Sequence, residues 1–207
     1  MSTYEEIANM KLTLWNQFFP HWLSVEIFSS SWFIIVLSML LLYAVLIMFI
    51  DKSRLREMIF YGSLLAVSFG YIDTIGTTMG LWIYKTNILP FTPSLFPFAY
   101  TLHPIVHLLV YQNTSTWRSF ILVNTLATAL FAFIAQPFFA WAQVLQLIRW
   151  SYLYSFVLAW GVTLFARGVI VWLANIEQSH STETRRTILS PKLQPAMKIL
   201  DEKDKKK

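Results

Sequence analysis

Two histidines stand four residues apart in an otherwise apolar run, at His103 and His107 in HPIVHLLVYQ. Residues four apart share one face of an α-helix, so both imidazoles would point the same way. Imidazole is a common metal ligand, but a metal site also needs a third ligand and a carboxylate that orients a ring nitrogen. The pair is either a metal- or haem-binding element or two polar side chains bonded to neighbouring helices. We expect the second, with no metal or other cofactor.

Asp73 is the strongest single candidate for a functional group. It lies in GYIDTIGTTMG, where Gly70, Asp73, Thr77 and Gly80 follow one helical stripe and Gly76 forms a GxxxG pair with Gly80. A carboxylate within a membrane span costs about 3 kcal/mol on insertion scales and seldom occurs without a partner or a water-filled cavity. Small residues on the same stripe let another helix approach closely. Asp73 is therefore either a proton or cation site or a buried hydrogen bond that locks two helices together.

Three further polar side chains complete a candidate intramembrane polar site: Tyr100, Gln136 and Arg167. At about 1.5 Å rise per residue, Asp73 and Gln136 both lie roughly 25 Å from the cytoplasmic ends of their helices, which predicts a direct hydrogen bond between them. Tyr100 and His103 are the next partners to consider for Asp73. Arg167 lies roughly 10 Å deep, so we expect it to extend its guanidinium to the cytoplasmic surface; the alternative is a buried ion pair.

The composition is that of a membrane protein. Of 207 residues, 56% are hydrophobic and 13% charged, against about 25% charged in soluble domains, and the mean hydropathy is +0.53. The absence of cysteine excludes disulfides, thiolate metal sites and cysteine nucleophiles. The net charge is +5, but eight basic residues follow Arg167. A basic tail of this kind indicates topology and anionic lipid, and no nucleic-acid partner is expected.

Five apolar runs are long enough to cross a bilayer core, which takes roughly 20 helical residues. They predict an all-α membrane bundle in a region spanning 31–175, with short polar connectors that favour antiparallel neighbours. The predicted spans lie near residues 32–50, 58–81, 95–112, 119–141 and 152–174.

The basic residues predict the orientation, because cytoplasmic connectors collect Lys and Arg. With an odd number of spans, the carboxyl terminus is then cytoplasmic and the amino terminus lies outside the plasma membrane. Lys52, Arg54, Arg56, Arg118 and the tail fall on one side, against Lys11, Lys85 and Arg149 on the other.

The two ends of the chain differ in character. Residues 1–30 contain a capping-box pair, Thr3 and Glu6, and apolar residues at near-helical spacing. We expect an amphipathic helix on the outer membrane surface, ending near Pro20 or His21; the alternative is a loosely ordered arm. No cationic stretch precedes an apolar core there, so a cleavable signal is not expected. Residues 176–207 form a basic cytoplasmic tail, predicted to be disordered.

The order of several landmarks resembles a known family. They are DKSRLRE, DTIGTTMGLWIY, LPFTPSLFPFAYTLHPIVHLLVYQ and FAFIAQPFFAW, within roughly residues 45–175. The chain looks like a family of small, uncharacterised multi-spanning membrane proteins of spore-forming Firmicutes, the bacilli and clostridia. The resemblance implies a location and a lineage, without an activity. In that family an acidic residue often replaces Ala99, and Glu often replaces Gln136. Since this chain retains only Asp73, the resemblance favours a structural Asp73 over a coupled transporter.

No catalytic motif is present: the chain has no nucleophile elbow, phosphate-binding glycine loop, HExxH or dinucleotide fingerprint. We expect a non-enzymatic integral membrane protein, either an accessory subunit or a small-solute or ion permeation element. The alternative is a metal- or haem-binding membrane protein that uses His103 and His107. The expected partners are the bilayer, with anionic lipid at the cytoplasmic face, and other proteins or a second copy of this chain.

Overall fold

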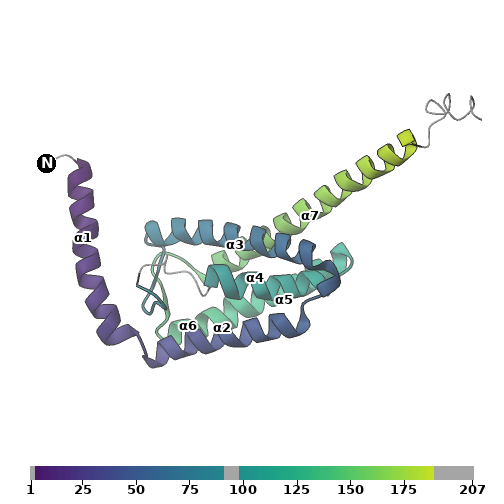
Figure 1. The fold of residues 1–207 in the computed structure, drawn as a ribbon. Helices are drawn as coiled ribbons and strands as arrows, with labels where there is room; N and C mark the ends of the chain where they lie inside the picture. The colour runs from purple at the N-terminus through teal and green to yellow at the C-terminus, as the bar shows by residue number, and fades with distance from the viewer. Residues whose placement is uncertain (1–2, 91–97, 189–207) are drawn as a thin grey trace, which may run out of the picture. The chain divides into compact units, whose positions relative to one another are not determined.

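Helices dominate the computed structural model, which describes residues 3–90 and 98–188, with side chains to Ser179 (Figure 1). The chain divides into two compact units, Met1–Arg167 and Gly168–Lys207. In chain order the elements are α1 (Thr3–His21), η1 (Trp22–Glu26), α2 (Ser30–Phe49), η2 (Lys52–Arg54), α3 (Leu55–Thr78), β1 (Trp82–Tyr84), η3 (Phe98–Leu102), α4 (His103–Gln112), α5 (Trp117–Leu130), η4 (Phe131–Ala135), α6 (Gln136–Trp141), β2 (Leu145–Leu147) and α7 (Tyr152–Ile188).

Among the described residues, four helical segments are long and apolar enough to cross a membrane: Ser30–Phe49, Lys52–Thr78, Trp117–Trp141 and Tyr152–Ser179. They coincide with four of the five predicted spans, so the helical membrane-type architecture is confirmed at that level. In the remaining predicted span, 95–112, helix runs from Phe98 to Gln112, which is shorter than the roughly 20 residues that a bilayer requires. Residues 95–97 lie outside the described residues. The count of five spans stays a prediction.

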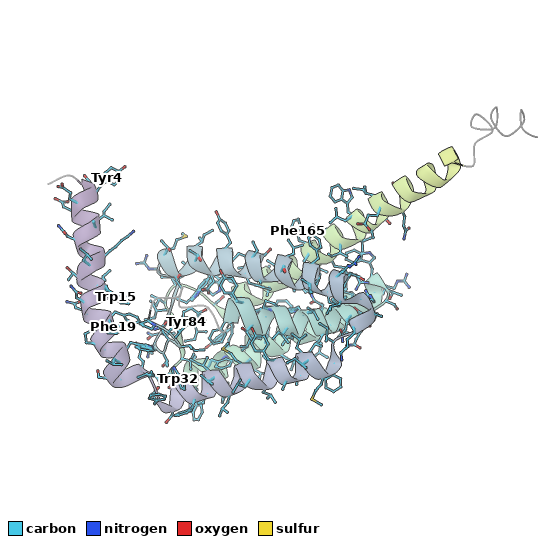
Figure 2. All side chains as sticks on the ribbon, viewed as in Figure 1. Tyr4, Trp15, Phe19, Trp32, Tyr84 and Phe165 are labelled. Atoms are coloured by element: carbon cyan, nitrogen blue, oxygen red, sulfur yellow. The ribbon has the colours of Figure 1, made fainter. Side chains whose placement is uncertain are left out.

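α2 illustrates how these helices expose apolar side chains that a bilayer would cover. Ile35 is its one buried residue, while Leu40 and Met48 are 61% and 74% exposed. Figure 2 shows side chains projecting around the helices. A helix that is apolar on all sides needs either a large protein core or a bilayer around it. Because little of α2 is covered by this chain, lipid is the environment that its side chains fit.

The turn after α3 redirects the chain. The sequence predicted helix to residue 81, but α3 ends at Thr78. Gly80 has φ +66°, and the amides of Gly80 and Leu81 donate to the carbonyls of Thr77 and Gly76 at 3.1 and 2.9 Å. This left-handed glycine closure is a common way to end a helix. It sends the next residues back along the helix they have just left.

The returning segment forms a strand that the sequence analysis did not predict. β1 pairs antiparallel with β2, in the register Trp82↔Leu147, Ile83↔Gln146 and Tyr84↔Leu145. The connector after α3 and the connector after α6 therefore meet at one end of the bundle. A hydrophobic core lies there, made of Ile35, Trp82, Phe98, Leu102, Phe131, Phe139, Ala142, Val144 and Leu145.

At the opposite end, the connectors after α2 and α4 meet. Gln112 accepts a hydrogen bond from the Asp51 amide at 3.1 Å and donates to the Phe49 carbonyl at 2.7 Å. The Tyr111 hydroxyl donates to Glu57, which also pairs with Arg54 at 2.6 Å. Alternate connectors thus gather at opposite ends, as short links between antiparallel helices require.

The amino-terminal helix ends where the sequence predicted, whereas the carboxyl-terminal helix is longer than predicted. α1 ends at His21, where the predicted amino-terminal helix ends, and has no buried residue; its placement on the outer surface stays a prediction. α7 continues to Ile188, so the prediction of a disordered tail is wrong for residues 176–188. That stretch contains no glycine or proline to stop a helix already under way. Residues 189–207 lie outside the described residues.

Candidate functional site

A cavity of about 70 Å³ lies inside the first unit beside Asp73. An engineered cavity that admits benzene is about 150 Å³, and one water needs roughly 10–15 Å³, so this space suits a few waters or a very small molecule. Its walls are mainly aromatic and aliphatic. The aromatic members are Phe69, Trp82, Tyr84, Phe98 and Trp150, and the polar ones include Asp73, His103, Gln136 and Ser155.

Asp73 is 8% exposed, and its two oxygens have different surroundings. Oδ1 accepts hydrogen bonds from the Trp82 indole Nε1 at 2.7 Å and from the Tyr84 hydroxyl at 2.8 Å. Trp82 and Tyr84 are two apart on β1, so both side chains leave the same side of the strand; Figure 2 labels Tyr84. Oδ2 is buried and has no hydrogen-bond partner in the described part of the chain.

Gly76 makes the Trp82 contact possible. It lies one turn after Asp73 on α3, and a Cβ at this position would come within 2.0 Å of the Trp82 ring. No side chain could occupy that space while the indole stays where it is. The glycine stripe on α3 was predicted to admit another helix; at Gly76 it admits an indole from β1.

Gln136 and His103 line the same cavity as Asp73. The predicted hydrogen bond between Asp73 and Gln136 is wrong, since the described bonds of Asp73 go to Trp82 and Tyr84. The reversal after Gly80 brings two donors to Oδ1, and counting depth along separate helices could not anticipate that. Gln136 Oε1 and His103 Nδ1 are buried without a partner among the described residues. Asp73 and Gln136 therefore line one cavity without a direct hydrogen bond between them.

The same local structure precedes His103 and Gln136. FAYTLHP, residues 98–104, and FAFIAQP, residues 131–137, share their spacing of phenylalanine, alanine, aromatic, polar residue and proline. In each, a π-helical turn ends immediately before the polar residue, which opens the following helix with proline at its second position. Proline lacks an amide donor, and π-helical turns are frequent at functional sites. The shared heptapeptide is a sequence signal that could have linked His103 to Gln136.

His107 belongs to a different structure from the cavity. Its Nδ1 donates to Asn124 Oδ1 at 3.0 Å, and Asn124 Nδ2 donates to Thr163 Oγ1 at 2.7 Å. All three side chains are fully buried, and they join α4, α5 and α7. Sequence reasoning missed Asn124 and Thr163, although an asparagine in the middle of an apolar span was a signal. The arrangement fits the interpretation that His107 bonds to neighbouring helices.

The two histidine rings do not converge on a point. They lie 6.1 Å apart with planes at 7°, and the His103 ring stacks on Phe69 at 4.4 Å. Across residues 3–90 and 98–179, no group of three or more His, Cys, Asp or Glu side chains is arranged to hold a metal ion. The geometry of the pair is that of stacked rings in a packed interior.

Arg167 is 5% exposed, so the prediction that it extends to the surface is wrong. Its guanidinium donates to the Thr114 carbonyl and hydroxyl at 3.3 and 3.1 Å and to the Ser115 carbonyl at 3.3 Å. The ring centre of Phe120 lies 4.4 Å from its Cζ. No carboxylate forms an ion pair with it in the described part, so the alternative of a buried ion pair is not seen either. Carbonyls beyond the end of α4, where the helix dipole is negative, hold the cation instead.

Tyr100 lies outside the cavity lining and is 39% exposed. It packs on α3 at Gly70, where a Cβ would come within 2.4 Å of the phenol oxygen. It is a packing partner of the glycine stripe, separate from the polar atoms around Asp73.

In the described part of the chain, four helices long and apolar enough to cross a membrane indicate a candidate multi-pass membrane protein, and a largely apolar cavity that contains Asp73 is its candidate site. Comparison with protein-family models, with curated proteins and with solved structures finds no match.

Proposed function

We propose that this chain is a non-enzymatic multi-pass membrane protein, and that the cavity beside Asp73 is a binding position for a small cation or solute on a permeation path. The observation that carries the proposal is the Oδ2 atom of Asp73, a residue that lines the cavity: this oxygen is buried and has no partner among the described residues. A buried polar group without a partner costs free energy, and an ionised one costs more. A ligand that donates to Oδ2 removes that cost.

The cavity size supports a small ligand. Sites for drug-sized molecules and organic cofactors occupy about 300–1,000 Å³, well above the 70 Å³ found here. Haem would need the larger volume, and the stacked rings of His103 and His107 offer no converging ligand pair. The metal- or haem-binding alternative is therefore the less supported of the two.

The proposal includes a placement in the plasma membrane with five spans, the amino terminus outside and the carboxyl terminus in the cytoplasm. The exposed apolar helices and the uneven distribution of Lys and Arg support it. Anionic lipid at the cytoplasmic face is a further proposed partner, and an accessory role beside another protein or a second copy fits the same placement. Membership in the family of spore-forming Firmicutes stays a proposal as well.

Flux through proteoliposomes tests the permeation function. Vesicles that contain the purified full chain are shocked with ammonium, potassium or sodium chloride, or with urea, and their volume recovery is followed by light scattering. The Asp73→Asn variant removes the carboxylate with little change in shape, and Glu177→Gln is its control at an exposed position. We expect the wild type and the control to accelerate recovery for at least one solute and Asp73→Asn to lose most of that acceleration. Equal recovery in all three, or recovery no faster than empty vesicles, would contradict the proposal.

A further inference from the structure

Among the described residues that line the cavity, the buried side-chain atoms without a hydrogen-bond partner can all accept a hydrogen bond. Asp73 Oδ2 and Gln136 Oε1 accept only, and a neutral His103 Nδ1 accepts when the proton is on Nε2. We infer that the ligand is a small primary ammonium cation, R–NH₃⁺, of about the size of methylammonium. The inference rests on the proposed binding position and names its chemical class.

Three donors of the cavity lining are already engaged. Trp82 and Tyr84 both donate to Oδ1 of Asp73, and the Trp150 indole donates to Ser155 Oγ at 3.0 Å. A ligand that brought its own acceptors would find none of these three donors free. A primary ammonium group brings three N–H donors, as many as the unpartnered buried side-chain acceptors of the described lining when His103 carries its proton on Nε2.

The aromatic walls favour an organic cation. The Trp82 and Trp150 rings meet edge to face at 5.2 Å, and the Tyr84 and Phe98 rings stack at 5.4 Å. The faces of such rings attract a cation, and the attraction is stronger where water is excluded. The same walls give an alkyl group an apolar surface to cover. Asp73 is the one carboxylate among the described lining residues and supplies the opposite charge.

The same features disfavour a metal cation. Calcium takes about 6–8 oxygen ligands, and magnesium requires an octahedral set. Among the described residues, the lining has two buried side-chain oxygens without a partner, from Asp73 and Gln136. The small volume also disfavours tetramethylammonium, which is bulkier and has no N–H to donate. The site should therefore rank methylammonium above sodium and above the quaternary cation.

Equilibrium binding to the detergent-purified full chain tests the ligand class. Trp82 and Trp150 line the cavity, so tryptophan fluorescence is read while methylammonium chloride replaces sodium chloride at constant ionic strength. A second titration uses tetramethylammonium chloride. We expect a saturable change with methylammonium, at least about tenfold tighter than with the quaternary cation, since a charge-assisted hydrogen bond contributes about 1.5–3 kcal/mol. This comparison uses the wild type alone, so it does not depend on any variant folding.

Variants then locate the ligand. Asp73→Asn should weaken methylammonium binding at least about tenfold, and Gln136→Leu by a smaller factor of roughly three to ten. Glu177→Gln and Gln146→Leu, at exposed positions, should leave it unchanged. No saturable response to methylammonium, an equal response to both ammonium cations, or an unaltered response in Asp73→Asn would overturn the inference. Flux of another solute without methylammonium binding would contradict the ligand class and leave the proposed function standing. Methylammonium binding without flux would contradict the permeation function and leave the ligand class standing.

Discussion

The indole Nε1 of Trp82 donates a hydrogen bond to Oδ1 of Asp73 at 2.7 Å, across the turn that ends α3. Asp73 lies in the helix and Trp82 in the strand that runs back beside it. Because the Tyr84 hydroxyl donates to the same oxygen at 2.8 Å, β1 holds the carboxylate through Oδ1, and Oδ2 is left buried without a partner among the described residues.

Removing the indole donor should weaken the fold. Trp82→Phe keeps an aromatic ring but deletes Nε1, and we expect a loss of about 1.5–3 kcal/mol in the free energy of unfolding, the range for a hydrogen bond to a charged group. Trp141→Phe, at a position 76% exposed, is the matched control and should change little. Unfolding in detergent measures both. A double-mutant cycle with Asp73→Asn should give less than the sum of the single losses; strictly additive losses would contradict a direct bond.

Two glycine substitutions should act in opposite directions. In Gly76→Ala the new Cβ meets the Trp82 ring at 2.0 Å, so the indole must move and we expect a loss of about 1–3 kcal/mol. In Gly161→Ala nothing lies within 4 Å, and alanine's better helix propensity should stabilise by up to about 1 kcal/mol. Thermal unfolding of the two variants, side by side, checks the sign of each change. Equal midpoints would show that the Trp82 ring does not depend on Gly76.

Arg167 should be sensitive to a change that keeps its charge. Arg167→Lys loses the fork that reaches both Thr114 and Ser115 and much of the stacking on Phe120. We expect a loss of about 2–3 kcal/mol, because buried carbonyls are left with fewer donors. Arg118→Lys, on an exposed side chain, should be nearly neutral when unfolding is measured in the same detergent. If Arg167→Lys left the free energy of unfolding unchanged, the positive charge alone would matter at this position, as it would for an arginine that reaches the surface.

Residue order alone predicted the features that depend on local composition. Apolar runs located four helices, because a run of about 20 apolar residues is stable in lipid only with its backbone bonds made internally. Asp73 stood out for a related reason, since a carboxylate within such a run requires compensation. Its burial at a cavity follows that expectation.

Tertiary structure decided which groups form hydrogen bonds with the buried polar side chains. Gly80 reverses the chain and β1 pairs with β2 about sixty residues further on, so the donors to Asp73 come from a strand and not from Gln136. Arg167 likewise finds its partners, Thr114 and Ser115, only because α7 brings it beside the residues that follow α4. Hydrogen bonds act over about 3 Å, whereas an estimate of depth carries an error of several ångströms. Helices and their apolar surfaces can therefore be read from residue order, while the partners of a buried polar atom depend on where the chain turns back.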